Sequence, residues 1–440
     1  MRAKILCRED DRRFEDTAQT TRWRTVGADL FLGNRSGRRQ RATAGLPVSA
    51  GAAPTLRLLL TADWQIGLRA GQLRERAGDL RRERLRAARR TLEVARSSGC
   101  ELVVVAGDLF DRPDVDADAV DGVVSLFAEF SDIPILVLPG NHDPVCEGDV
   151  WGRREWRSAP AHVHLLREAR EIELSSLVGG EVAPAALYPC PIGQKQSRLD
   201  PTGWIPSRAE GDERLRLGIA HGSLDSMGKA TNFPIAHRRA ELAGLDFLAL
   251  GDWHGTTILE RAAYPGTPEQ CSFGEQGAGS ALVVTLRRGA PPQIEQHRVG
   301  RFHWVQEEVE VRSASDLQAL RHVFDAGGSA PESTIARLRL ELAGGDLQLI
   351  ERSEGLLEQL REELFFLDAA LEVLDLSEVE FESPLLAALD ASLHALEQGE
   401  PVPDALDELR AAPLEVVREA RLQLRRWMGA ARGELEEAEA

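Results

Sequence analysis

The sequence ELVVVAGDLFDRP, residues 101–113, is an apolar run that ends at Gly107 and Asp108. A short continuous run rich in Val and Leu is typical of a strand that is buried on both faces of a sheet. Loops that follow such strands carry the functional side chains of α/β proteins. The stretch therefore predicts a central strand with a carboxylate at its carboxyl end.

The same arrangement of an apolar run followed by polar residues recurs four times. LRLLLTA precedes Asp63-Trp64-Gln65, IPILVLP precedes Gly140-Asn141-His142-Asp143, LRLGIA precedes His221, and DFLAL precedes Gly251-Asp252-Trp253-His254. Any one of these could be a turn residue, a helix cap or a hydrogen-bonded core histidine. Because Asp, Asn and His are also metal ligands, their joint occurrence favours a dinuclear metal site.

Apolar runs alternate with polar, Arg-rich stretches from Leu56 to about Val299. Two further runs, HVHLL and ALVVTLRR, are also expected to be strands. Residues 71–98 and 116–130 are the clearest covering helices. The pattern predicts an α/β sandwich with the functional loops at the strand ends.

Composition divides the chain into four expected parts. They are a disordered or mis-started tail over 1–53, the motif-bearing domain over 54–300, a small α+β unit over 301–380, and C-terminal helices over 381–440. Within the last part, amphipathic helices are predicted over 384–396 and 404–429, joined by the breaker EQGEPVP.

The net charge of −18 is unusual for a nucleic-acid-binding protein, but it is unevenly distributed. Residues 351–440 carry about −15, whereas residues 69–96 carry about +6. The Arg-rich helix over 74–90 is therefore a candidate for contact with a DNA backbone, although such charge runs are usually solvated faces.

Five scattered cysteines without a C-x-x-C pair indicate a reducing cytoplasm. The chain has no apolar run of about 18 residues, which predicts that it has no transmembrane helix.

Hydrolysis of a phosphodiester needs charge neutralisation and a strong nucleophile, and two metal ions about 3.5–4 Å apart supply both. Asp108 is the best candidate for a carboxylate that bridges two metals, and Asp63 for a terminal ligand. Asn141 offers an amide oxygen, while His221 and His254 offer imidazole nitrogen.

His142 directly follows Asn141 and can face the substrate, where a histidine that is not a ligand can protonate the leaving oxygen. Asp111 is placed to orient His142, and Arg112 to meet a phosphate oxygen. For Asp143, a turn cap is the alternative to a role in the site.

These residues resemble the signature of the calcineurin-like metallophosphoesterases: D-x-[HQ], GDxxD, GNHD, a His at a strand end, and G-x-x-H. TADWQIG, GDLFDRP, LPGNHDP and YPGTPEQCSF are most similar to the SbcD-type DNA exonuclease subunit of double-strand-break repair. The resemblance covers residues 55–300 strongly and residues 301–378 more loosely. It implies a four-layer sandwich of two mixed sheets flanked by helices, a small α+β cap domain, two metal ions and nuclease activity.

Two positions depart from the family pattern, because Gln65 and Asp252 stand where the family usually has His. Gln65 would be a weaker ligand and Asp252 a harder, charged one, so the exchange favours Mn²⁺ or Mg²⁺, with Fe and Zn²⁺ as the alternatives. It could also leave the first metal loosely held. In the other interpretation, Gln65 only supports the ligands and activity is reduced.

The resemblance implies two ligand sets that share Asp108. Asp63, Gln65, Asp108 and His254 would hold the first metal, and Asp108, Asn141, His221 and Asp252 the second. His142 would be the general acid, oriented by Asp111. We therefore expect a cytoplasmic Mn²⁺-dependent phosphodiesterase, a DNA exo/endonuclease subunit in repair. The alternatives are a phosphoesterase for small nucleotides or phosphoproteins, and a weakly active scaffold for an ATPase.

The resemblance implies DNA and an SbcC-type coiled-coil ATPase as partners, and leaves a homodimer open. Residues 384–429 are candidates for the ATPase contact, because LEVVREARLQLRRW presents apolar positions at helical spacing with a basic face. Packing of this helix on its own domain is the alternative. Trp151, Trp156 and Trp204 lie in long insertions, where they could stack on a base or, more commonly, fill the core.

Overall fold

The computed structural model describes residues 54–179, 182–227, 232–326, 330–342, 346–373, 384–403, 412–421 and 423–424. The expected tail over residues 1–53 lies outside these ranges. So do residues 404–411 and 425–429 of the second predicted C-terminal helix.

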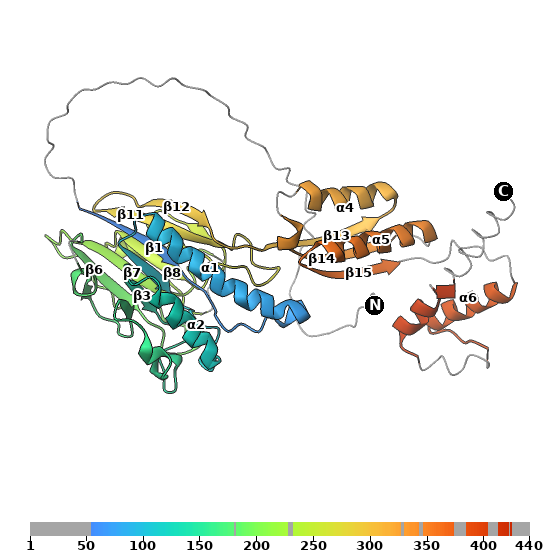
Figure 1. Cartoon of the computed structure of the whole chain (residues 1–440), viewed down its shortest axis with the longest axis horizontal. Helices are drawn as coiled ribbons and strands as arrows, with labels where there is room; N and C mark the ends of the chain where they lie inside the picture. Colours follow the sequence, from blue (N-terminus) through green and yellow to red (C-terminus); the bar gives the residue numbers. More distant parts are fainter. Residues whose placement is uncertain are drawn as a thin grey trace, which may run out of the picture.

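The first sheet has the strand order β12-β11-β1-β2-β3-β4 (Figure 1). Its strands are β1 (Thr55–Thr61), β2 (Leu102–Ala106), β3 (Ile135–Leu138), β4 (Val163–Leu165), β11 (Ser280–Arg287) and β12 (Gln293–Arg298). Strands β1 to β4 are parallel, and β11 and β12 complete the sheet in antiparallel pairing. The carboxyl ends of β1, β2 and β3 therefore meet at one edge.

The second sheet has the order β5-β6-β7-β8-β10-β9. Its strands are β5 (Ile172–Glu173), β6 (Ala185–Cys190), β7 (Leu215–His221), β8 (Phe247–Gly251), β9 (Thr257–Ile258) and β10 (Ala262–Tyr264). The four inner strands are parallel and both edge strands are antiparallel. β7 and β8 thus end side by side at His221 and Gly251.

The two sheets pack face to face through alternate residues of their strands. Leu58 and Leu60 of β1 lie in one buried cluster with Leu217 and Ile219 of β7. The opposite face of the first sheet is covered by helices α1 (Ala77–Ser97) and α2 (Ala117–Ala128). The outer face of the second sheet is covered by irregular segments and the short helix α3 (Arg239–Leu242). The predicted fold class, two large mixed sheets with flanking helices, is confirmed.

Short 3-10 helices fill several of the connections. They are η1 (Gly71–Arg76), η2 (Val150–Gly152), η3 (Trp156–Ser158), η4 (Leu174–Ser176) and η5 (Pro331–Ser333). The helix predicted over 71–98 is interrupted within η1, where Arg74 leaves helical geometry with φ of 49°, and the regular helix α1 begins at Ala77.

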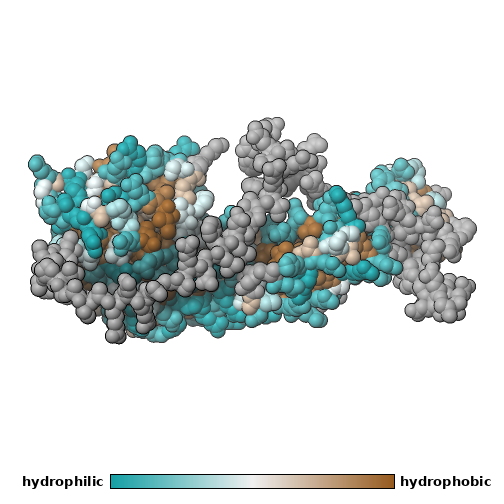
Figure 2. All heavy atoms as spheres, turned by 90° about the horizontal axis from the view of Figure 1, so that it is seen from above, coloured by the Kyte–Doolittle hydropathy of each residue, from teal (hydrophilic) through white to brown (hydrophobic). Residues whose placement is uncertain are grey.

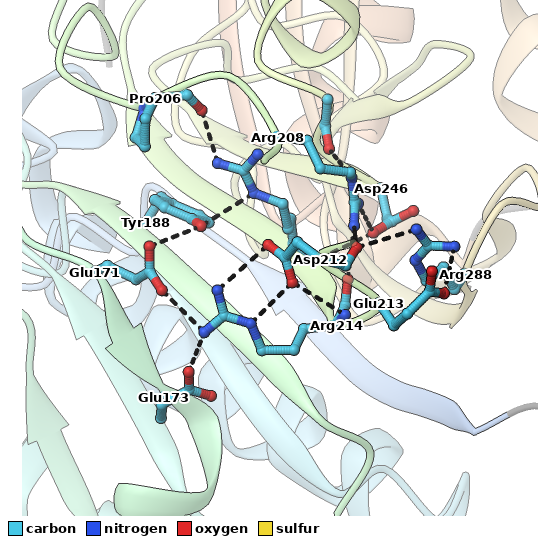
Figure 3. A network of polar contacts seen from close by, with 12 residues as sticks. Glu171, Glu173, Tyr188, Pro206, Arg208, Asp212, Glu213, Arg214, Asp246 and Arg288 are labelled. Atoms are coloured by element: carbon cyan, nitrogen blue, oxygen red, sulfur yellow. Dashed lines mark hydrogen bonds and ion pairs between the residues drawn. The ribbon is translucent and has the colours of Figure 1, made fainter. Parts of the chain in front are cut away.

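A polar network lies at the amino ends of β7 and β8, at the opposite edge from the five motifs (Figure 3). Buried Arg216 donates to the Tyr188 hydroxyl and to two backbone carbonyls. Asp246 accepts from Arg208 at 2.6 Å and from the Arg216 backbone at 2.9 Å. Because buried charges need partners, this network stabilises the far edge of the second sheet.

The cap is a parallel three-stranded sheet in the order β13-β14-β15. Its elements are β13 (His303–Val311), α4 (Ala314–Ala326), β14 (Thr334–Leu342), α5 (Leu347–Glu363) and β15 (Phe366–Val373). Both helices pack on the sheet around Leu340, Ile350 and Leu360. Leu73 and Leu80 of the sandwich pack against Phe302, Ile335 and Phe366, so an apolar junction joins the two parts.

Helix α6 (Pro384–Glu397) follows the cap, and residues 414–421 are helical. Leu393 of α6 packs with Val417, and Arg421 forms buried ion pairs with Asp390 and Glu397. These helices therefore pack on each other. No helix among the described residues is long and apolar enough to cross a membrane.

Candidate metal centre

Strained backbone marks the loops that follow β1, β2 and β8. The Asp63 amide donates to the Gly107 carbonyl at 3.1 Å and the Gln65 amide to the Asp108 carbonyl at 2.9 Å, so the β1–β2 pairing continues past the strands. Asp63, Gln65, Asp108 and Asp252 have φ of 55°, 42°, 53° and 102°. They are four of the seven non-glycine residues with positive φ in the described part of the chain. Such strain costs of order 1–3 kcal/mol per residue and clusters at functional sites.

Two glycines allow the side chains of the centre to approach each other. A Cβ at Gly107 would stand 2.1 Å from His221 Nδ1, and a Cβ at Gly140 would stand 2.1 Å from Asp108 Oδ1. Real Cβ atoms do not approach this closely. Gly107 is therefore required by the packing of His221, and Gly140 by the packing of Asp108.

His221 is fully buried, and its ring nitrogens have unlike surroundings. Nδ1 lies 3.0 Å from the Ala106 carbonyl oxygen and donates to it, which leaves Nε2 unprotonated in the neutral ring. Nε2 faces Asn141 Oδ1 at 2.8 Å, Asp108 Oδ1 at 3.4 Å and Asp252 Oδ1 at 3.9 Å. Three oxygens around an unprotonated nitrogen repel it unless a cation or a proton lies between them. This donor set fits a divalent cation.

Asp63 and His254 form the other half of the centre. Asp63 is fully buried, and both of its carboxylate oxygens lie 3.2 Å from the Asp252 amide. Gln65 Nε2 lies 3.1 Å from His254 Nε2, and His254 Nδ1 lies 2.8 Å from Glu275 Oε1. Ligand atoms of Asp63, Asp108 and His221 lie within 4.8 Å of one another.

No Lys or Arg among the described residues forms an ion pair with Asp63 or Asp108. Burial raises the pKa of Asp63 to about 6, against the attraction of the nearby histidines. Burial would also raise the pKa of Asp108, but the charge and hydrogen bond of His221, together with those of His142, outweigh it and hold this pKa below its usual value. Burial would lower the pKa of His221, yet Asp108 raises it well above the usual range. Without a metal, a proton on His221 thus neutralises part of the carboxylate charge, and metal binding would release this proton.

His142 lies at the edge of the centre with a third of its side chain exposed. Its Nδ1 is 2.7 Å from the backbone oxygen of Asp111 but 3.9 Å from the Asp111 carboxylate. Asp111 therefore does contact the ring, and its backbone carbonyl is the closer of its two groups. Its backbone amide donates to Asp108 Oδ1 at 2.9 Å. Arg112 Nε lies 3.0 Å from exposed Asp114, and no other ion pair of Arg112 occurs among the described residues.

Asp143 is fully buried and joins two of the motif loops. Its carboxylate accepts from the Gly140 amide at 2.7 Å and from the Phe110 amide at 2.9 Å. Burial and the charge of Asp108 raise the pKa of Asp143 to about 7. These contacts favour the interpretation of Asp143 as a turn cap over a role as a ligand. The same carboxylate also joins the loop after β3 to the loop after β2.

The motifs did not reveal two supporting residues. Arg84 of α1 is buried and donates to the Asp63 and Trp64 carbonyls on one side and to the Glu269 carbonyl on the other. Glu275 contacts His254 and follows the conspicuous stretch YPGTPEQCSF by two residues. The position of Glu275 just beyond that stretch is the one sequence feature that pointed to it as a supporting residue. Arg84 stands within an Arg-rich helix, where nothing in the sequence distinguishes it.

The tryptophans of the insertions belong to the interior. Trp151 and Trp156 are buried with their ring centroids 4.7 Å apart, and Trp204 packs on Tyr188 at 6.0 Å. The core interpretation of these residues is therefore the one that their surroundings support. Trp253, between two predicted ligands, is instead 43% exposed.

Comparison with known proteins gives a family match over the region that builds the centre. Residues 56–256 match the family model for calcineurin-like phosphoesterase. A segment of 282 residues is 28% identical to the DNA double-strand break repair protein Mre11 of Aeropyrum pernix. That match covers 59% of this chain and 65% of that protein, so the chain spans less than two thirds of its relative.

Two crystal structures show weak likeness, and each match covers 56% of this chain. The protein TT1561 of Thermus thermophilus is 14% identical, is covered completely and has a TM-score of 0.33. The calcineurin-like phosphoesterase YfkN from Bacillus subtilis is 10% identical, is 92% covered and has a TM-score of 0.34. Likeness at this level carries no conclusion about this chain.

Proposed function

The chain carries a calcineurin-like phosphoesterase domain over residues 56–256, and on that premise we propose that it is a metal-dependent phosphodiesterase that cleaves DNA. The observation that carries the proposal is the environment of His221, whose Nε2 faces three oxygen ligands. The choice of DNA rests on the relative that is named as a DNA double-strand break repair protein.

We propose two metal positions that share Asp108. Asp63, Gln65 and His254 would complete the first, and Asn141, His221 and Asp252 the second. Oxygen donors outnumber nitrogen donors in this set, which favours Mn²⁺, with Mg²⁺, Fe and Zn²⁺ as the alternatives. Divalent cations held here would neutralise phosphate charge and activate the attacking water.

The residues of the chain would position the phosphate and supply a proton. The Asp111 carbonyl accepts a hydrogen bond from His142 Nδ1, so Nε2 of the protonated ring would be the atom that protonates the leaving oxygen. The partial exposure of this ring allows a substrate to reach it. Arg112, in the same loop as Asp111, would bind a phosphate oxygen.

We also propose the helices after the cap as the contact for an SbcC-type ATPase. Leu385 of α6 is 77% exposed and Val416 is 53% exposed, although Leu393 and Val417 pack between the helices. The outward apolar side chains leave a surface for a partner helix.

Replacement of His142 tests its assignment as the general acid. His142→Ala is expected to lower turnover about 10²–10⁴-fold while Mn²⁺ binding is retained, because the ring donates a proton without holding a metal. The control is His322→Ala on an exposed position of the cap, which should leave turnover unchanged. Wild-type turnover in His142→Ala would rule out the assignment.

One assay distinguishes the proposed nuclease from its alternatives. The full chain is incubated with Mn²⁺ and either linear DNA or bis-p-nitrophenyl phosphate, with and without an SbcC-type ATPase. Mn²⁺-dependent cleavage of DNA is the expected result. Cleavage of only the small substrate would indicate a phosphoesterase for small molecules, and cleavage of neither would indicate a scaffold.

A further inference from the structure

We propose that Glu275 is a positioning residue for His254 and that Gln65 caps the same ring, so that the two metal positions bind Mn²⁺ with unequal affinity. This inference rests on the proposed function, because it concerns the metals of that centre. It depends on three contacts: one joins the loop after β10 to the loop after β8, one lies within the loop after β10, and one joins the loop after β8 to the loop after β1.

Glu275 is held at both of its carboxylate oxygens. Oε1 lies 2.8 Å from His254 Nδ1, and Oε2 accepts from the Cys271 backbone amide at 2.7 Å. Only 12% of the Glu275 side chain is exposed. The carboxylate therefore has little freedom to move, and it fixes the orientation of the His254 ring from the side opposite the metal ligands.

This contact decides which nitrogen of His254 carries the proton. The Glu275 carboxylate accepts a hydrogen bond from Nδ1, so in the neutral ring Nε2 is the unprotonated nitrogen and the potential metal ligand. Carboxylates that accept from a metal-bound histidine in this way orient the ring and raise its basicity. Glu275 thus prepares His254 Nε2 to bind a cation.

Gln65 occupies the position that this nitrogen faces. Its Nε2 lies 3.1 Å from His254 Nε2, and an amide N–H is the only Gln65 group that can donate to an unprotonated nitrogen. If the Gln65 amide were turned round, its Oε1 would face the unprotonated His254 Nε2, and two hydrogen-bond acceptors would repel each other. A cation that binds His254 must therefore displace this hydrogen bond.

His221 differs from His254 in this respect. Its Nε2 faces oxygens of Asp108, Asn141 and Asp252, and no hydrogen bond from a donor to this nitrogen occurs among the described residues. A cation at His221 would lie among oxygens that are themselves proposed ligands and would displace no side-chain donor, whereas a cation at His254 must displace the Gln65 amide. We therefore expect the His221 position to bind first and more tightly.

Calorimetric titration of the metal-free full chain with Mn²⁺ tests the inference. The wild type should show two binding events of different affinity. Glu275→Ala should weaken only the weaker event, by about 10–100-fold, as for other carboxylates that support a metal-bound His. Glu275→Gln should have an intermediate effect, because its amide oxygen can still accept from Nδ1. Gln65→His should strengthen the weaker event about tenfold or more.

Two controls separate positioning from general damage. Glu260→Ala removes an exposed carboxylate and should leave both events unchanged. The imidazole ¹⁵N shifts of His254, measured without metal, should show a proton on Nδ1 in the wild type and a mixture of tautomers in Glu275→Ala.

Two equal Mn²⁺ affinities in the wild type, or equal weakening of both events by Glu275→Ala, would overturn the inference and leave the proposed function standing. An unchanged titration in Glu275→Ala would also overturn it. Absence of any Mn²⁺ binding would refute the proposed function itself.

Discussion

Single side chains at the centre each hold more than one motif in place. The Asp108 carboxylate accepts from the His142 amide and lies beside His221, so it links the loops after β2, β3 and β7. Asp143 joins the loops after β2 and β3 through two backbone amides. The precision of the centre therefore depends both on a proposed ligand, Asp108, and on Asp143, which contacts backbone amides.

Removal of the Asp143 carboxylate should destabilise the protein. Asp143→Ala leaves the buried amides of Phe110 and Gly140 without acceptors, which costs roughly 2–4 kcal/mol of the free energy of unfolding. Urea unfolding measures the loss. Asp114→Ala, which alters an 83% exposed side chain, is the control and should change stability by less than about 0.5 kcal/mol. Similar losses in both variants would contradict the role of Asp143.

The sequence predicted candidate ligands but not the residues that orient them. Asp63, Asp108 and His221 each end an apolar run, and the structure brings them together. Glu275 acts through its contact with His254, which lies 21 positions away in the chain, and a local sequence pattern does not predict such a contact. Sequence spacing placed Asp111 near His142, but it could not show that the backbone carbonyl, at 2.7 Å from Nδ1, lies closer than the carboxylate, at 3.9 Å.

Among the elements of the sandwich, the long apolar strands were predictable, and so was the edge strand β4 within HVHLL, whereas strands of polar or interrupted sequence were missed. β1, β2, β3, β7, β8 and β11 are continuous apolar runs, as buried strands require. β12 was missed because it is an edge strand of polar sequence that pairs only with β11. β6 was missed because Pro189 interrupts its apolar run, and a proline argues against a central strand.

The turn after β2 should tolerate no side chain at Gly107. Gly107 has φ of 95°, and a Cβ there would meet His221. Gly107→Ala is therefore expected to displace His221 and abolish tight Mn²⁺ binding, as measured by calorimetry. Gly99→Ala is the matched control, because Gly99 also has positive φ but faces open space. It should cost only about 1 kcal/mol of stability and leave Mn²⁺ affinity unchanged. Tight Mn²⁺ binding by Gly107→Ala would show that the turn is not required.

In the molecule as a whole, the Arg-rich helix α1 is largely neutralised. Arg89 pairs with Glu129, Arg96 pairs with Asp132, and buried Glu83 pairs with neighbouring arginines. Figure 2 shows hydrophilic residues over much of the face seen from above, with hydrophobic areas between them. Because these arginines are already paired, their local excess in the sequence overstated the charge available for DNA phosphates.

The junction between sandwich and cap should respond to pH through Glu269. This buried carboxylate accepts from the Arg301 and Phe302 amides, and burial raises its pKa to about 7. A carboxyl pKa that is raised on folding contributes stability below about pH 4.5, and this is lost as the pH rises through about 7. The difference in melting temperature between the wild type and Glu269→Ala should therefore shrink from pH 5 to pH 8. A constant or growing difference would contradict the raised pKa.

The number of metal ions beside Asp108 tests the proposed centre more sharply than any activity. Crystals of the full chain grown with saturating Mn²⁺ and measured at the manganese absorption edge reveal each ion directly. We predict two ions per chain, one on either side of the Asp108 carboxylate, and loss of both from Asp108→Ala. A single ion, no ion, or two ions bound away from Asp108 would contradict a dinuclear phosphoesterase centre.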